Sequence, residues 1–137
     1  MTTFLITLIT LIMTLASPQP LPDPAHVAGI CKGEASFAIE ECACSVQNRV
    51  GAGWRPDLVM SAYYAPWIPP TEHEIELVAT VLAGKTDCNP DFYYMLEPAS
   101  VIHLGMSHLE PAGVIKSPDG NRRVSFYPRE AWRERQP

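Results

Sequence analysis

Glu34 is the residue whose position in the sequence most favours chemistry. Val27, Ile30 and Cys31 precede it at the spacing of one helical face, so Glu34 continues an apolar stripe at the last turn of the helix. A carboxylate on an apolar face costs free energy unless it is paired, protonated or open to a cleft. Two interpretations follow: Glu34 is a general acid/base, or it is a structural glutamate that caps the helix or pairs with Arg49.

Glu34 also lies within a series of short motifs between residues 27 and 127. Residues 33–35 read GEA, residues 46–50 read VQNRV at the end of the next helix, and a proline leads a short helical segment after them. Further along come ATVLAG, an aromatic FYY, and a closing GN followed by VSFY. This series resembles the SleB-type cell-wall hydrolases, which are similar to lysozyme-like lytic transglycosylases. The GEA and NRV motifs are the most specific part of the resemblance.

The resemblance implies a fold, a reaction and a partner. It implies a small lysozyme-like domain that cleaves the β-1,4 MurNAc–GlcNAc bond of peptidoglycan glycan strands, without a cofactor and with Glu34 as the single acid/base. The sequence departs from the family in two places. The interval from Glu34 to Asn48 is shorter, and arginine or serine replaces the family's closing histidine. These departures indicate either a divergent branch of the family or a domain that has lost catalysis. The shorter interval favours the alternative of a non-catalytic cell-wall-binding or structural exported module of the same fold.

The expected chemistry at Glu34 is proton transfer at a glycosidic bond. Such a bond breaks when a carboxylic acid protonates the leaving oxygen. Hydrolysis also requires a second carboxylate across the sugar, and Asp57, Asp87 and Asp91 are available, although no motif marks any of them. A lytic transglycosylase requires one glutamate alone, because the sugar's own 6-hydroxyl attacks. Transglycosylation is therefore the favoured prediction.

Aromatic and amide side chains are candidates for the surroundings of this site. Tyr63, Tyr94 and Tyr127 are predicted to bind substrate by stacking on sugar faces, with membership of the core as the alternative. Asn48 and Arg49 are predicted to fix the loop around Glu34 by hydrogen bonds rather than to contact the substrate. The four histidines lack metal-ligand spacing, so no metal site is predicted.

The cysteines indicate an oxidising compartment. The four of them, at positions 31, 42, 44 and 88, allow three pairings, and the sequence does not choose among these. Cys42 and Cys44 lie two residues apart on a predicted helix and face different directions, so they should not pair with each other. At least one disulfide is expected if the chain is exported. Free buried thiols are the main alternative, and a zinc site is a lesser one.

The N-terminal segment predicts export. Residues 1–16 contain no charged side chain, and their apolar run is short of the roughly 20 residues that cross a bilayer. Prolines alternate through residues 17–24, which predicts a stiff extended spacer. We therefore expect a signal peptide or membrane anchor (1–16), a proline-rich spacer (17–24) and one domain (25–137). The protein is expected to be extracellular, cell-wall-associated or membrane-anchored, with a soluble cytosolic chain as the remaining alternative.

Charge is distributed unevenly along the chain. The formal net charge is -5, but residues 1–115 carry four basic and twelve acidic side chains, whereas residues 116–137 carry six basic and three acidic ones. A basic C-terminal part could face an anionic polymer such as the cell wall. A solvated terminus is the alternative. The negative net charge and the lack of a basic stripe across the domain make nucleic acid a disfavoured partner.

The elements that position these residues are mainly helical. Apolar periodicity predicts four helices, with Asp23 and Ser36 as N-caps and a capping box from Thr71 to Glu74: 24–35, 37–50, 57–65 and 71–83. The C-terminal part is expected to contain an extended segment, one or two helical turns and a β-hairpin, at 91–96, 100–104 and 114–127. The predicted class is α+β, mainly helical, with a C-terminal β-hairpin, in a monomer.

Overall fold

The structure, a computed structural model, describes residues 21–63 and 65–136. The predicted signal peptide or anchor at 1–16, and most of the predicted spacer, lie outside the described residues. Among the described residues, no helix is long and apolar enough to cross a membrane.

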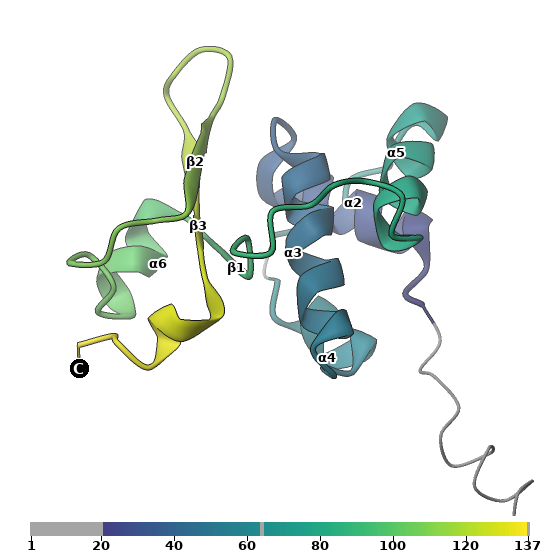
Figure 1. The fold of residues 1–137 in the computed structure, drawn as a ribbon. Helices are drawn as coiled ribbons and strands as arrows, with labels where there is room; N and C mark the ends of the chain where they lie inside the picture. The colour runs from purple at the N-terminus through teal and green to yellow at the C-terminus, as the bar shows by residue number, and fades with distance from the viewer. Residues whose placement is uncertain (1–20, 64, 137) are drawn as a thin grey trace, which may run out of the picture.

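The chain forms an α+β fold that is mainly helical, as predicted. Figure 1 shows helices α2 to α5 on one side, and a small sheet with α6 and a short 3-10 helix on the other. The elements, in chain order, are α2 (Pro24–Ala35), α3 (Ile39–Gly51), α4 (Pro56–Ser61), α5 (Glu72–Leu82), β1 (Tyr94–Leu96), α6 (Pro98–His103), β2 (Gly113–Lys116), β3 (Arg123–Tyr127) and η1 (Arg129–Trp132).

Local capping signals fix the starts of α2 and α5. The Asp23 carboxylate accepts a hydrogen bond from the Ala25 amide at 3.2 Å, and Pro24 occupies the first helical position. At α5, the Thr71 hydroxyl accepts from the Glu74 amide at 3.2 Å, and the Glu74 carboxylate accepts from the Thr71 amide at 2.8 Å. Both predicted N-termini are confirmed.

The predicted cap at Ser36 is wrong. α3 begins at Ile39, its N-cap is Ala38, and no side chain caps it. Ser36 instead ends α2, and the Ala38 amide donates to the Ala35 carbonyl at 2.9 Å across a tight turn. Tertiary packing outweighs the local signal here, because Ala38 and Phe37 pack against β3.

Helices α2, α3 and α5 share one buried core. Val27 of α2, Val46 of α3 and Val78 of α5 are fully buried in this cluster. A disulfide between Cys31 and Cys42 joins α2 to α3, and a second between Cys44 and Cys88 joins α3 to the segment after α5. The expected disulfide is confirmed, and so is the expectation that Cys42 and Cys44 do not pair.

The β half contains one strand more than a hairpin. The sheet is antiparallel with the order β1-β3-β2, so β3 is its central strand. Phe92, just before β1, stacks on Phe126 of β3 with ring centroids 4.5 Å apart. Val124 and Phe126 are buried against Ala35 and Ala38. The turn between α2 and α3, directly after Glu34, is therefore the place where the sheet packs on the helices.

An ion pair couples α2 to α5, and it predicts a loss of stability in acid. The Lys32 ammonium donates to the Glu74 carboxylate at 2.8 Å and to the Pro69 carbonyl at 3.2 Å. The hydrogen bond from Lys32, followed by that from the Thr71 amide, holds the pKa of Glu74 below its usual range. A lowered carboxyl pKa stabilises the fold above the unfolded-state value of about 4.3, and this stabilisation is lost as the pH falls through the lowered value.

We expect Lys32→Met to lower the free energy of unfolding near neutral pH by about 1 kcal/mol. The variant should also lose less stability than the wild type as the pH is lowered. Urea unfolding at a series of pH values measures both effects, with Lys85→Met as an exposed control. Parallel pH profiles for wild type and Lys32→Met would contradict the assignment.

Candidate functional site

Glu34 lies in the last turn of α2 and is half-buried, at the junction between the helices and the sheet. Its carboxylate Oε1 accepts a hydrogen bond from the backbone amide of Ala65 at 2.9 Å. A backbone donor fixes the orientation of a carboxyl group more tightly than a long side chain does, because the backbone has fewer rotatable bonds.

Two glycines on α2 allow the backbone around Ala65 to approach Glu34. A Cβ at Gly33 would lie 2.0 Å from the carbonyl oxygen of Pro66, and a Cβ at Gly29 would lie 1.8 Å from the indole nitrogen of Trp67. The Ile68 amide donates to the Gly29 carbonyl at 3.1 Å. Residues 65–68 therefore lie directly against one face of α2. Two glycines four residues apart mark this face in the sequence, and this signal was not used in the sequence-based prediction.

This close approach explains why α4 is shorter than predicted. The expected helix was 57–65, but α4 ends at Ser61. A helix continuing to Ala65 would use its amides within the helix, whereas the amides of Ala65 and Ile68 bond to α2 instead. Contacts with α2 thus outweigh the local helical tendency.

We expect Gly33→Ala to displace residues 65–66 from α2, because the new methyl group would overlap a backbone carbonyl. Overpacking of this kind costs typically 1–3 kcal/mol, and the Ala65–Glu34 hydrogen bond should lengthen or break. Thermal unfolding and an amide-exchange measurement at Ala65 test both parts. Gly51→Ala is the matched control, since a Cβ there meets nothing within 4 Å. Equal stability of the two variants would refute the close approach.

Asn48 and Arg49 form hydrogen bonds to other segments, but Asn48 binds the chain before β1 and not the loop around Glu34, so this part of the prediction is wrong. The Asn48 amide donates to the carbonyls of Asn89 and Phe92, each at 3.0 Å, and so ties down the chain before β1. Arg49 is buried, and its guanidinium donates to the Tyr63 hydroxyl and lies 5.5 Å from the centre of that ring. Arg49 thereby positions Tyr63, which lies two residues before the Ala65 amide that binds Glu34.

The three predicted sugar-stacking tyrosines are not brought together. Tyr63 is half-buried beside the helical core, whereas Tyr94 and Tyr127 are paired across β1 and β3. Tyr127 is 3% exposed and packs with Met106 and Ala131, so the prediction that its ring stacks on a sugar is corrected to a core role.

Tyr94 packs with the same C-terminal cluster as Tyr127. It is half-buried, with the ring centres of Tyr93 and Trp132 lying 4.9 Å and 5.8 Å away. Burial raises the pKa of both Tyr94 and Tyr127. Of the three predicted tyrosines, Tyr63 lies closest in sequence to Ala65, whose amide binds the Glu34 carboxylate.

The candidate second carboxylates lie on exposed positions. Asp57 is paired with Arg55 at 2.6 Å, and this hydrogen bond holds the pKa of the Asp57 carboxyl below its usual range. Asp87 and Asp91 are exposed in the segment between α5 and β1.

Glu97 is the carboxylate that sequence reasoning missed. The Nη2 atom of Arg122 donates to the Glu34 carbonyl at 2.9 Å and to the Glu97 carboxylate at 3.2 Å. Arg122 thus links the end of α2 to the residue that precedes α6. No local signal could have found this link, because Arg122 is 88 residues from Glu34 in the sequence.

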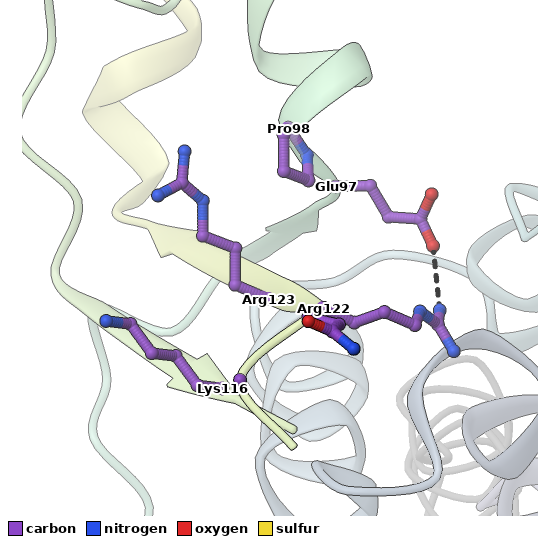
Figure 2. A pocket seen from close by; sticks show the side chains of 7 residues that line it. Glu97, Pro98, Lys116, Arg122 and Arg123 are labelled. Carbon is purple, nitrogen blue, oxygen red and sulfur yellow. Dashed lines mark hydrogen bonds and ion pairs between the residues drawn. The ribbon is translucent and has the colours of Figure 1, made fainter. Parts of the chain in front are cut away.

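A basic pocket lies beside this link. Its volume is about 390 Å³, and it is lined by Glu97 and Pro98 at the start of α6 and by the β2–β3 hairpin, which supplies Lys116, Arg122 and Arg123. Figure 2 shows Arg122 directed toward Glu97, while Lys116 and Arg123 extend away from that pair. Glu34 is not among the lining residues, but its backbone carbonyl accepts a hydrogen bond from Arg122, which is one of them.

No cluster of three or more His, Cys, Asp or Glu side chains that could hold a metal ion occurs within residues 21–63 and 65–136. All four cysteines are in disulfides.

Comparison of the chain with family models, with curated proteins and with solved structures finds no match.

Proposed function

We propose that the chain cleaves the β-1,4 MurNAc–GlcNAc bond of peptidoglycan glycan strands, with Glu34 as the single acid/base. The observation that carries the proposal is the setting of Glu34: a half-buried carboxyl at a helix end, oriented by the Ala65 amide. Its resemblance to the GEA motif of SleB-type hydrolases supplies the reaction class. The helical core, with a small sheet packed directly after Glu34, is consistent with a lysozyme-like domain.

The reaction needs one proton moved out and back. Glu34 gives its proton to the glycosidic oxygen, which leaves with both electrons of the bond to C1 of MurNAc. The 6-hydroxyl of the same MurNAc then attacks C1, and the Glu34 carboxylate takes the proton of that hydroxyl. Glu34 returns to its starting state, and the product carries a 1,6-anhydro end.

The carboxylates of the described residues favour this route over hydrolysis. Inverting and retaining hydrolases both place a second carboxyl group opposite the acid, either to activate water or to attack the sugar. Glu97 is linked to the end of α2 through Arg122, and Asp57 is paired with Arg55. Both of these carboxylates are therefore already paired with an arginine.

Export is part of the same proposal. The two disulfides suit an oxidising compartment, because thiols are kept reduced in most cytosols. A substrate in the cell wall requires the enzyme to leave the cytoplasm. Residues 1–16 would direct this export as a signal peptide or membrane anchor. The proposed location is therefore extracellular, cell-wall-associated or membrane-anchored.

The alternative is a wall-binding module of the same fold without catalysis. The replacement of the family's closing histidine favours it, since Arg122 at this place is occupied with the Glu34 carbonyl and Glu97.

Product analysis distinguishes the alternatives. Purified protein is incubated with peptidoglycan, and soluble fragments are examined by mass spectrometry. Muropeptides with 1,6-anhydro ends are the expected result. Reducing ends would indicate hydrolysis and direct attention to Glu97→Gln, whereas sedimentation with the walls without release would support the binding module.

A further inference from the structure

Two cations of the basic pocket lie opposite each other on neighbouring strands of the sheet. Lys116 of β2 and Arg123 of β3 are directly opposite partners in the antiparallel register, and both are exposed. Like charges at directly opposed positions destabilise a strand pair. Over the described residues, 21–63 and 65–136, neither side chain forms an ion pair or a side-chain hydrogen bond. The third cation, Arg122, forms an ion pair with Glu97.

We infer that this pocket binds an anionic group of the substrate, namely a carboxylate of the peptide stem that each MurNAc carries. The inference rests on the proposed function, because the stem is attached to the sugar whose bond Glu34 would cut. It assigns to Lys116 and Arg123 a role in recognising substrate, and to the pocket a preference for glycan strands that retain their stems.

The position of the pocket fits this assignment. Arg122 lines the pocket and also donates to the Glu34 carbonyl at 2.9 Å, so the pocket adjoins the end of α2 that carries the proposed acid. A strand held with its glycosidic bond at Glu34 would bring an adjacent stem toward the hairpin. The volume of about 390 Å³ is in the range of sites for small ligands, roughly 300–1,000 Å³.

The charges of the pocket fit a carboxylate as well. An anion between Lys116 and Arg123 would relieve their mutual repulsion while making charge-assisted hydrogen bonds to both. Arg122 need not take part, since Glu97 already occupies its guanidinium. The pocket also explains where the excess of basic residues in the C-terminal part of the chain meets an anionic polymer.

Binding measurements on the full chain test the inference. The Glu34→Gln substitution is used as background so that bound glycan is not cut, and Lys116→Gln/Arg123→Gln is compared with the background alone. Three probes are used: glycan strands with stems and without teichoic acid, the same strands stripped of stems by an amidase, and isolated teichoic acid. Lys85→Gln/Arg133→Gln is the matched control, because it removes two exposed positive charges outside the pocket.

The double variant should bind stem-bearing strands about tenfold more weakly, which corresponds to about 1.4 kcal/mol for the loss of two exposed ion pairs. Binding to stripped strands, and binding by the control variant, should not change. The melting temperature of the Lys116→Gln/Arg123→Gln variant should equal or exceed that of the background protein, because a like-charge pair has been removed. A melting temperature that falls would indicate a structural role for the two residues and overturn the inference.

The other outcomes are equally distinct. Unchanged binding to all probes, or equal weakening on stripped and stem-bearing strands, would overturn the stem assignment. Weakening confined to teichoic acid would assign the pocket to phosphate and overturn it too. In the otherwise wild-type chain, the double variant should raise KM for stem-bearing strands with little change in kcat. If the wild type cuts nothing, the proposed function fails, while the binding comparison still decides what the pocket holds.

Discussion

Glu34→Gln should reduce the rate of peptidoglycan cleavage by about 10²–10⁴-fold. The amide keeps the size of the side chain and can still accept the hydrogen bond from the Ala65 amide. It cannot give a proton to the glycosidic oxygen or take one from the 6-hydroxyl. The loss should therefore appear in kcat, while affinity for glycan strands is retained. Release of dye from labelled peptidoglycan, followed over time, measures the effect.

Glu41→Gln is the matched control for this substitution. Glu41 is also half-buried, but it lies in the first turn of α3, where a negative charge interacts favourably with the helix dipole. It should retain cleavage within a few fold of the wild type. Equal rates for wild type and Glu34→Gln would remove Glu34 as the acid. A Glu34→Gln protein with a much lower melting temperature would show instead that the residue is structural.

Removing the Cys44–Cys88 disulfide should give the largest loss of stability. The bond joins residues 44 positions apart, and it ties the segment before β1 to the buried face of α3. A cross-link closing a loop of this length stabilises a fold by about 4 kcal/mol in the chain-entropy treatment, with measured losses of about 2–5 kcal/mol. Cys44→Ala/Cys88→Ala should lower the free energy of urea unfolding by an amount in this range.

The second disulfide provides the comparison. Cys31 and Cys42 are 11 positions apart, so the same treatment gives Cys31→Ala/Cys42→Ala a loss about 1 kcal/mol smaller. Peptide mapping without reduction should recover both pairs from the wild type. Four freely alkylated thiols in the native protein would contradict the disulfides. A Cys44→Ala/Cys88→Ala variant as stable as the wild type would contradict their contribution to the fold.

The sequence predicted best where the determinant is local. The Asp23–Pro24 start of α2 and the Thr71–Glu74 capping box each involve residues within one turn, and both form as expected. Ser36 shows the limit of this reasoning. It has the chemistry of an N-cap, but the burial of Phe37 and Ala38 against β3 moves the start of α3 to Ile39.

The candidate site follows the same division. Helical periodicity placed Glu34 at a helix end on the edge of the core, and the structure agrees. Its surroundings come from distant parts of the chain: the Ala65 amide is 31 residues away and Arg122 is 88 residues away. Such contacts depend on how the sheet and the 65–68 segment pack on α2. The periodicity of one element carries no information about them.

A crystal structure of Glu34→Gln with a stem-bearing glycan fragment tests the central claim most directly. The account predicts that the glycosidic oxygen lies about 2.6–3.2 Å from the side chain at position 34. C1 and the 6-hydroxyl of MurNAc should face that side chain. A fragment that is well ordered elsewhere on the molecule, with no glycosidic oxygen within hydrogen-bonding distance of position 34, would contradict the assignment of Glu34 as the acid/base.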